Sequence, residues 1–160
     1  MTKIIDNFLD KSYFDNLQKL VLSNDFSWFF QNTVNINQKK DDLYFYLTHL
    51  LYTNNKPHSN FFVLFEPLLS KINYEKLIRV KLNLYPKTEK FRINAPHIDF
   101  NYENKGFLFY FNTCNSKTIL HDKQVDCIEN RGVYFDPTKP HSSSSCTNAQ
   151  ARFSLNVNYI

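Results

Sequence analysis

Apolar and polar residues alternate along much of the chain beyond residue 76, which is the pattern of half-buried β-strands. The run from 151 to 159 shows this clearly, because polar side chains stand at every second position. Turn-forming residues separate such runs, for example at Asn101–Lys105 and Asp136–Pro140. The alternation predicts strands at about 77–85, 92–100, 106–113, 117–121, 124–129, 132–136, 141–146 and 151–159.

The first 30 residues combine strand and helix patterns. Lys3–Phe8 is predicted to form a short strand. A helix is predicted to follow, capped by Asp10 or Ser12, because apolar residues recur at helical spacing up to Val21. Phe26–Phe30 is rich in strand-forming aromatic residues and predicts a further strand.

Residues 43–76 are less clear. Leu43–Tyr52 fits either a strand or a helix, and we favour a strand because of its aromatic residues. A helix is predicted to begin after Ser59. Pro67 either kinks this helix or opens a second one, since proline is tolerated in the first turn of a helix and disruptive in its interior.

These elements predict a mainly β protein. Many short strands at regular spacing are typical of a sandwich or an open barrel, and we expect a double-stranded β-helix of the jelly-roll or cupin-like type with supporting N-terminal helices. A length of 160 residues fits a single domain. We expect residues 1–76 to form helical and strand support and residues 77–160 to form the β-helix core.

Composition and charge narrow the classes of function. Aromatic residues make up 17% of the chain and glycine occurs twice, which argues against disorder. The net charge is only +4, and Lys39-Lys40 is followed by Asp41-Asp42, so no basic stripe supports a nucleic-acid partner. The sequence has no apolar run of about eighteen residues, so we expect a soluble, cytoplasmic protein without a membrane partner.

The most specific candidate chemistry lies in Pro96-His97-Ile98-Asp99. In an extended strand His97 and Asp99 point to the same side and can hold one metal ion. A histidine from a distant strand, for which His141 is our candidate, completes two nitrogens and one oxygen on one face of the metal. This set is typical of non-haem iron(II) and leaves positions open for substrate and oxygen.

Each candidate also has a simpler interpretation. A His-x-Asp pair arises often by chance, and either side chain could be solvated or hydrogen-bonded. Asp136 is a rival carboxylate ligand, although an aspartate before proline usually begins a turn. The polar face of residues 151–159 points to water in an ordinary strand, and into a cavity only where a buried ligand satisfies it. The remaining histidines fit solvated or hydrogen-bonded roles: His49, His58 and His121.

His97-x-Asp99, His141 and Arg152-x-Ser154 together resemble the iron(II)- and 2-oxoglutarate-dependent oxygenases, in particular small single-domain members of the prolyl-hydroxylase-like branch. The resemblance covers roughly the second half of the chain. It implies iron(II), 2-oxoglutarate and oxygen as cofactor and co-substrates, with ascorbate as a candidate auxiliary reductant. It also implies that Arg152 grips the distal carboxylate of 2-oxoglutarate, which Ser154 shares, since a guanidinium meets a carboxylate with two charge-assisted hydrogen bonds.

Two further residues are candidates for contacts with 2-oxoglutarate. Asn83 and Tyr85 share one face of the predicted strand 77–85. An Asn-x-Tyr pair ahead of His-x-Asp is similar to a pattern in some members of the superfamily, where both side chains bind the co-substrate. Tyrosine is also common in strands, and Asn83 could simply satisfy a neighbouring backbone group.

The sequence departs from the family in two places. Ser116-Lys117 precede Thr118, where members often have Gly-Gly. Nucleic-acid dealkylases carry a second arginine late in the last strand, where this chain has Asn158-Tyr159-Ile160. We therefore expect a hydroxylase of a protein side chain or small molecule, with no catalytic side chain beyond the metal ligands. A nucleic-acid base oxygenase or dealkylase and a non-catalytic binding module remain alternatives.

Overall fold

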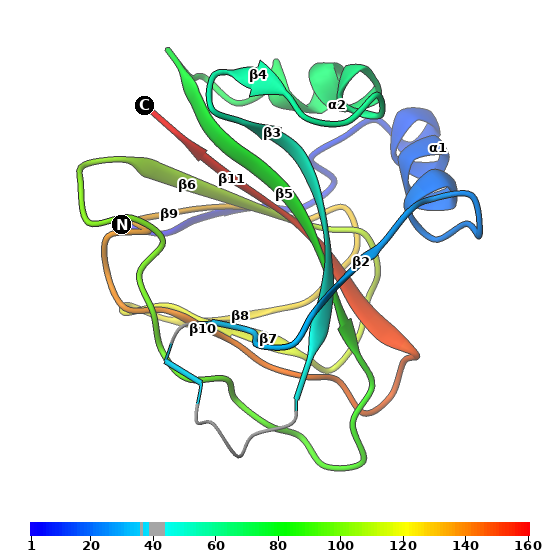
Figure 1. Ribbon diagram of the computed structural model, residues 1–160, viewed down its shortest axis with the longest axis vertical. Coiled ribbons are helices and arrows are strands. Elements are labelled where there is room, and N and C mark those ends of the chain that lie inside the picture. The colour runs from blue at the N-terminus through cyan, green and yellow to red at the C-terminus, as the bar shows by residue number, and fades with distance from the viewer. Residues whose placement is uncertain (36, 39–43) are drawn as a thin grey trace.

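Two antiparallel sheets and two helices form the structure, a computed structural model that describes residues 1–35, 37–38 and 44–160 (Figure 1). The eight strands of the larger sheet are, in spatial order, β1 (Lys3–Ile5), β9 (Gly132–Phe135), β6 (Lys105–Tyr110), β11 (Ala151–Tyr159), β5 (Leu77–Pro86), β3 (Tyr46–Thr53) and β2 (Phe29–Gln31), with β4 (Lys56–Pro57) beside β3. The smaller sheet has the order β10 (Ser142–Ser143), β7 (Lys117–Ile119) and β8 (Gln124–Asp126).

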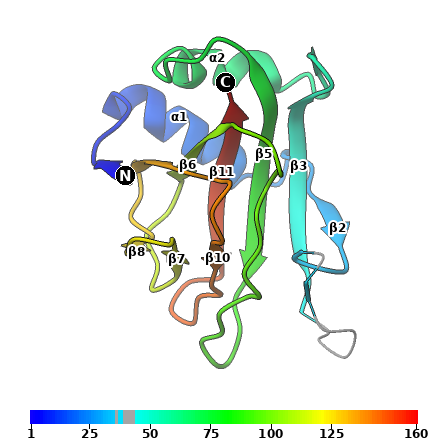
Figure 2. The ribbon, with the colours of Figure 1, turned by 90° about the vertical axis from the view of Figure 1, so that its left-hand side faces the viewer.

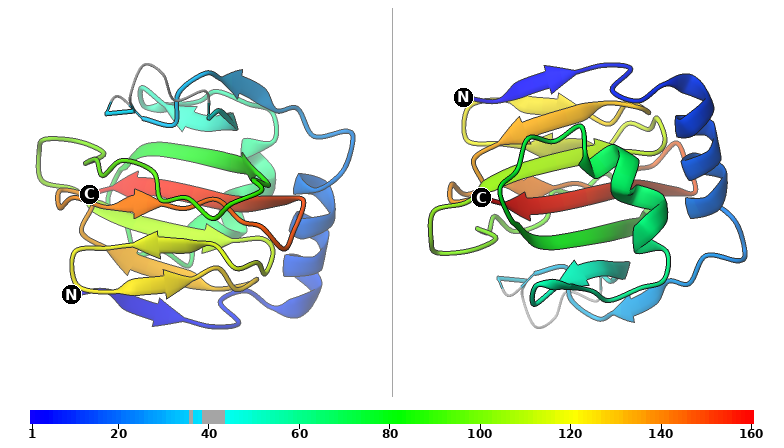
Figure 3. Two further views of the ribbon diagram at one scale, coloured as in Figure 1. Left: turned by 90° about the horizontal axis from the view of Figure 1, so that it is seen from below. Right: turned by 90° about the horizontal axis from the view of Figure 1, so that it is seen from above.

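The helices α1 (Lys11–Val21) and α2 (Phe62–Leu69) cover one face of the larger sheet, and the smaller sheet lies on the other side (Figures 2 and 3). Apolar side chains of both helices pack against those of β5, β6 and β11, because alternate residues of each strand point to the helices. The buried residues of this core include Phe14, Leu17, Phe65, Leu68, Leu82, Phe107, Phe109 and Leu155.

The opposite face of β11 and β5 is polar and nevertheless buried. Arg152, Ser154 and Asn158 are at most 1% exposed, and Asn83 on the paired strand β5 is 5% exposed. The polar face of β11 therefore points into the space between the sheets. The alternative in which it faces water is wrong, and its burial implies that polar partners or a ligand satisfy it.

The predicted strand at 92–100 is wrong. This segment makes only two isolated bridges, Ile93 with Ser144 and His97 with His141. A continuous ladder fails because Pro96 has no amide proton to donate. Side chains from another part of the chain donate to carbonyls of this segment instead. Asn35 donates to the carbonyl of Ala95 over 2.8 Å, and Asn37 donates to the carbonyl of Pro96 over 2.7 Å.

The strand predicted at 151–159 forms with those bounds, and most of the other predicted elements exist with different bounds. The strands expected at 141–146 and 124–129 shrink to two and three residues. The strand expected at Phe26–Phe30 forms at Phe29–Gln31, and that expected at Leu43–Tyr52 forms at Tyr46–Thr53, with residue 43 outside the described residues. Asp10 stands at the N-terminal cap of α1 without a side-chain cap hydrogen bond. Pro67 lies inside α2 and does not open a second helix.

The predicted fold class is confirmed. The strands form two antiparallel sheets with the helices as outer support, and the space between the sheets holds both the polar face of β11 and a second apolar core that includes Leu108, Val125 and Phe135. Within the described residues, no helix is both long enough and apolar enough to span a lipid bilayer.

Candidate metal centre

His97 and His141 lie opposite each other in one of the isolated bridges. The amide of His97 donates to the carbonyl of His141 over 3.0 Å, and the amide of His141 donates to the carbonyl of His97 over 2.9 Å. Directly opposed residues of an antiparallel pair send their side chains to the same side. The two ring centroids are accordingly 4.6 Å apart. A single backbone pairing thus brings two imidazoles together from distant parts of the chain.

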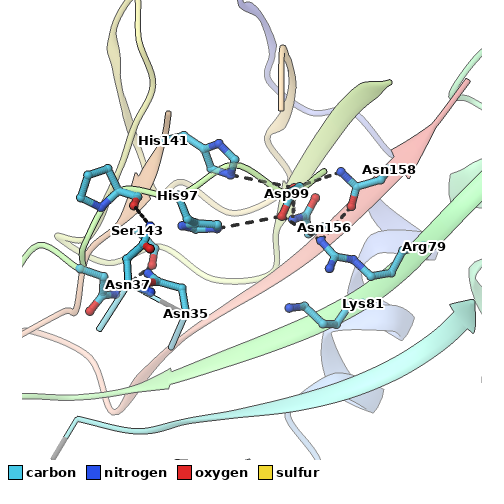
Figure 4. A network of polar contacts seen from close by, with 12 residues as sticks. Asn35, Asn37, Arg79, Lys81, His97, Asp99, His141, Ser143, Asn156 and Asn158 are labelled. Carbon is cyan, nitrogen blue, oxygen red and sulfur yellow. Dashed lines mark hydrogen bonds and ion pairs between the residues drawn. The ribbon is translucent and has the colours of Figure 1, made fainter. Parts of the chain in front are cut away.

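Asp99 completes the group (Figure 4). Its Oδ1 lies 4.0 Å from Nε2 of His97, and its Oδ2 lies 3.9 Å from Nε2 of His141. One ligand atom from each side chain lies within 4.8 Å of the other two. In the described part of the chain this is the only group of three or more His, Cys, Asp or Glu so arranged. The structure therefore brings together the three residues expected to be metal ligands.

Three side chains hold the carboxylate of Asp99, which is only 5% exposed. Nη2 of Arg79 donates to Oδ1 over 2.8 Å, and the amides of Asn158 and Asn156 donate to Oδ2 over 3.0 and 3.2 Å. Arg79 also donates to Oδ1 of Asn158 over 3.0 Å. These contacts set the direction of the Asp99 carboxylate independently of a metal, which is the usual role of groups behind a metal ligand.

Burial lowers the pKa of His97 to about 4, and the neighbouring His141 adds to this effect. Burial by itself would raise the pKa of Asp99, but Arg79, the two asparagine amides and His141 outweigh it and hold this pKa at about 2. Near neutral pH His97 is therefore neutral and Asp99 is ionised. These are the protonation states that metal binding requires.

The tautomer of His141 is also suited to a metal. Its Nδ1 lies 2.9 Å from the carbonyl oxygen of Lys139, and a carbonyl can only accept. In the neutral ring the proton is therefore on Nδ1, and Nε2, which faces Asp99, has the lone pair. Two imidazole nitrogens and one carboxylate fit a divalent first-row metal ion such as iron(II).

Arg152 lies deeper, at the far end of the same polar face. Its side chain is 1% exposed and sits between the rings of Tyr85 and Tyr110, at 5.4 and 5.3 Å. Nη1 donates to the carbonyls of Lys117 and Ser144 over 3.0 and 3.4 Å, and Nη2 donates to Oγ1 of Thr118 over 2.6 Å. Among the described residues no carboxylate lies within ion-pair distance of this guanidinium.

The donors left on Arg152 suit a carboxylate. A guanidinium carries five N–H groups, and the contacts above use three of them. The Nε–H and one Nη2–H remain, on two nitrogens of the same planar group. In the described part of the chain Nε is buried without a hydrogen-bond partner. Two parallel donors on one edge are the arrangement that binds both oxygens of a carboxylate.

A small cavity connects Arg152 to the metal ligands. It has a volume of about 40 Å³, and its lining includes Asn83, Tyr85, Ser154, His97 and His141. Oδ1 of Asn83 is another buried atom without a hydrogen-bond partner among the described residues. All four residues expected to bind 2-oxoglutarate therefore line one cavity with two of the metal ligands. This volume holds only about three water molecules, so a five-carbon diacid requires lining side chains to turn aside.

The rival residues take the simpler roles. Oδ1 of Asp136 accepts from the amide and the hydroxyl of Thr138 over 3.0 and 2.6 Å, which is the turn expected of an aspartate before proline. His49 is a buried histidine with Nδ1 2.6 Å from the carbonyl of Ser27 and Nε2 2.7 Å from the hydroxyl of Ser59.

Sequence reasoning missed several residues that hold the site. Arg79 and Lys81 share the inner face of β5 with Asn83 and Tyr85, and only the latter two were proposed as site residues. The same two-residue period contained the signal, because it runs from 79 to 85 without a break. Thr118 had no comparable signal, because its contact with Arg152 joins strands of different sheets.

No protein-family model and no curated protein matches the sequence. Solved structures do match in fold. An oxidoreductase of the 2OG-Fe(II) oxygenase family from Burkholderia pseudomallei has a TM-score of 0.68 at 10% sequence identity, with 99% of this chain and 84% of that chain covered.

Two prolyl hydroxylases are also similar in fold. An enzyme from Trichoplax adhaerens, in complex with a peptide fragment of the hypoxia inducible factor oxygen degradation domain, has a TM-score of 0.63 at 17% identity, covering 99% of this chain and 83% of its own. A prolyl-4-hydroxylase from Pseudomonas putida has a TM-score of 0.61 at 15% identity, with 99% and 91% covered. The chain therefore has the jelly-roll fold of the 2-oxoglutarate- and iron(II)-dependent oxygenases, and the resemblance seen in the sequence is confirmed at the level of fold.

Proposed function

We propose that the chain is a non-haem iron(II) dioxygenase that couples oxidative decarboxylation of 2-oxoglutarate to hydroxylation of a protein side chain or a small molecule. The convergence of His97, Asp99 and His141 inside this fold carries the proposal. The uncompensated guanidinium of Arg152 at the other end of the same cavity supports it.

Each site residue has a stated role in this proposal. His97, Asp99 and His141 hold iron(II) on one face. Arg152 binds the distal carboxylate of 2-oxoglutarate through its free edge, and Ser154 shares that carboxylate. Asn83 and Tyr85 make further contacts with the co-substrate. Bound iron(II) and 2-oxoglutarate supply the activation of oxygen, with succinate and carbon dioxide as co-products.

The protein contributes position and charge. Arg79, Asn156 and Asn158 keep the Asp99 carboxylate directed at the two imidazoles. The neutral state of His97 lets iron(II) bind without displacing a proton from that ring near neutral pH. Because a prolyl hydroxylase in complex with a peptide shares the fold, we favour a protein side chain as the substrate.

Succinate formation from 2-oxoglutarate tests the proposal directly. The purified protein is incubated with iron(II), ascorbate and oxygen but no added substrate, and compared with His141→Ala and with His121→Ala. His121 is an exposed histidine in a turn, so His121→Ala is a matched control. We expect slow succinate production by the wild type and the control, and none by His141→Ala.

Metal binding provides the second readout. We expect His141→Ala to retain much less iron(II) than the wild type and His121→Ala in equilibrium dialysis. Equal metal content in all three proteins, with no succinate from any, would overturn the proposal and favour a binding module on the same fold.

A further inference from the structure

A large cavity lies at the β2–β3 edge of the larger sheet and reaches Lys81 on the inner face of β5. Its volume is about 610 Å³, and its lining includes Phe29, Tyr46, Thr48, Phe61 and Lys81. The strand register places Phe29 opposite Thr48 and Thr48 opposite Asn83, so all three face the same side of the sheet. Tyr46, Thr48 and Lys81 therefore connect the cavity to the polar inner face that the metal ligands meet, whereas His49 and Phe61 line it from the helix side.

Lys81 stands where this cavity meets the metal centre. On β5 it lies between Arg79, which holds Asp99, and Asn83, which lines the smaller cavity beside Arg152. Figure 4 shows the Lys81 side chain extending from β5 on the side of the strand where His97 and Asp99 lie. A substrate in the large cavity that reaches the metal must pass close to this ammonium.

In the described part of the chain no carboxylate lies within ion-pair distance of Lys81, although Asp99 is near enough to favour its charged form. Its Nζ makes one long hydrogen bond, 3.4 Å to the hydroxyl of Tyr46, and lies 5.6 Å from the centre of that ring. The two neighbouring cations are already engaged, Arg79 by Asp99 and Arg152 by backbone carbonyls and Thr118. Burial, together with Arg79, lowers the pKa of Lys81 to about 8. A partly buried ammonium with unused donors is costly unless an anion joins it.

The lining indicates what kind of anion fits. Lys81 is the only lysine or arginine among the described residues that line the large cavity. The buried histidine in this lining, His49, already has both ring nitrogens hydrogen-bonded. One ammonium whose neighbouring cations are already engaged balances a single carboxylate better than a doubly charged phosphate.

We propose that Lys81 anchors a carboxylate of the substrate in the large cavity and so sets which substrates reach the metal. The proposal rests on the proposed function, because it names the substrate of the same site. The carboxylate belongs to a glutamate or aspartate of a peptide or to a small carboxylic acid, and both sources present the same group to Lys81.

The test measures binding without turnover. Zinc(II)-loaded protein is saturated with 2-oxoglutarate, so that the Arg152 cavity is filled, and then titrated with probes in NMR experiments. The probes are two mixed libraries of N-acetylated, C-amidated pentapeptides that differ only in glutamate or glutamine at the central position. N-acetylglutamate amide, compared with N-acetylglutamine amide, tests a small carboxylic acid.

We expect the wild type to bind the glutamate library at least tenfold more tightly than the glutamine library. Lys81→Met should remove this preference, and Lys81→Arg should keep most of it. Lys56→Met is the matched control, because Lys56 is an exposed lysine on β4, and it should behave as the wild type. If N-acetylglutamate amide is preferred over N-acetylglutamine amide as strongly as the glutamate peptides are over the glutamine peptides, the substrate is a small carboxylic acid. If only the peptides show the preference, the substrate is a polypeptide.

Two results would overturn the role of Lys81. One is equal binding of the glutamate and glutamine probes by the wild type. The other is a loss of 2-oxoglutarate affinity in Lys81→Met as large as in Arg152→Met, which would place Lys81 in the co-substrate site. If the protein fails to bind metal, the proposed function is overturned. If it binds metal but shows no preference for a carboxylate, only the role of Lys81 is overturned.

Discussion

Single residues behind the metal ligands determine how Asp99 is presented. Asn158 is fully buried, donates to Oδ2 of Asp99 and accepts from Arg79. It therefore links a cation and a carboxylate that would otherwise pair without a fixed direction. Such partners of a metal ligand contribute to affinity even though they never touch the metal.

Replacing Asn158 tests this link. We expect Asn158→Ala to weaken metal binding by about 10- to 100-fold, because Asp99 loses one of its donors and Arg79 loses an acceptor. Isothermal titration with zinc(II) measures the change. Asn101→Ala, at an exposed turn position, is the control and should leave the affinity unaltered. Equal affinities for the two variants would remove Asn158 from the metal centre.

Arg152 should affect the co-substrate and not the metal. Arg152→Met removes the guanidinium that lines the small cavity. We expect at least about a 100-fold loss of 2-oxoglutarate affinity, because one partner of a buried charge pair is then missing. Zinc(II) affinity should change by less than about threefold. Calorimetry with each ligand separates the two effects, and a parallel loss of both would show that the variant disturbs the whole interior.

At the scale of elements, the sequence predicted the positions of the strands better than it predicted which segments pair with one another. The alternating pattern located β5 and β11 closely, since each is long and one face of each is continuously apolar. The pairing of His97 with His141 left no local trace, because it is a single bridge between two segments without regular structure. The prediction of a strand at 92–100 was wrong for a different reason. Its residues favour extended backbone, but Pro96 and the contacts of Asn35 and Asn37 interrupt the ladder.

The candidate ligands were still correctly grouped, although for a partly wrong reason. A regular strand was expected to direct His97 and Asp99 to one side. In the structure each is positioned by its own backbone contact, His97 with His141 and Asp99 with the carbonyl of Pro137 over 3.2 Å. His97 lies in an isolated bridge and Asp99 in a bend, and their side chains nevertheless converge on one site. The residues that surround Asp99 could not be assigned from spacing alone, because they come from two other strands.

The segment that carries His97 should depend on its few tethers. The amide of Asn94 donates to the carbonyl of Ser143 over 2.9 Å, and its side chain donates to the hydroxyl of Ser143 over 2.9 Å. We expect Asn94→Ala to lower zinc(II) affinity about tenfold and to speed hydrogen exchange at the amides of His97 and His141, since the neighbouring bridge loses support. Exchange as slow as in the wild type would show that the bridge holds without this tether.

For the whole molecule, the buried ionisable groups of the site couple its folding stability to pH. The pKa of His97 is about 4 in the folded protein, whereas the ordinary value for a histidine is 6.5. As the pH falls, His97 therefore binds a proton in the unfolded chain before it does so in the folded protein. Stability from this group is therefore complete above 6.5 and is lost progressively towards 4. Asp99, with a pKa of about 2 against an ordinary 3.8, extends the loss to lower pH in the same direction.

We therefore expect the metal-free protein to lose about 2 kcal/mol of unfolding free energy between pH 7 and pH 5 through His97 alone. Urea unfolding at the two pH values measures this difference. In His97→Gln, which cannot be protonated, the loss should shrink by that amount, while His121→Ala should keep the pH dependence of the wild type. The same pH dependence in His97→Gln as in the wild type would mean that His97 is not held neutral by burial. Because the His97 ring, with a pKa of about 4 in the folded protein, is already neutral at both pH values, saturating zinc(II) should raise the unfolding free energy through this residue to nearly the same extent at pH 7 and at pH 5.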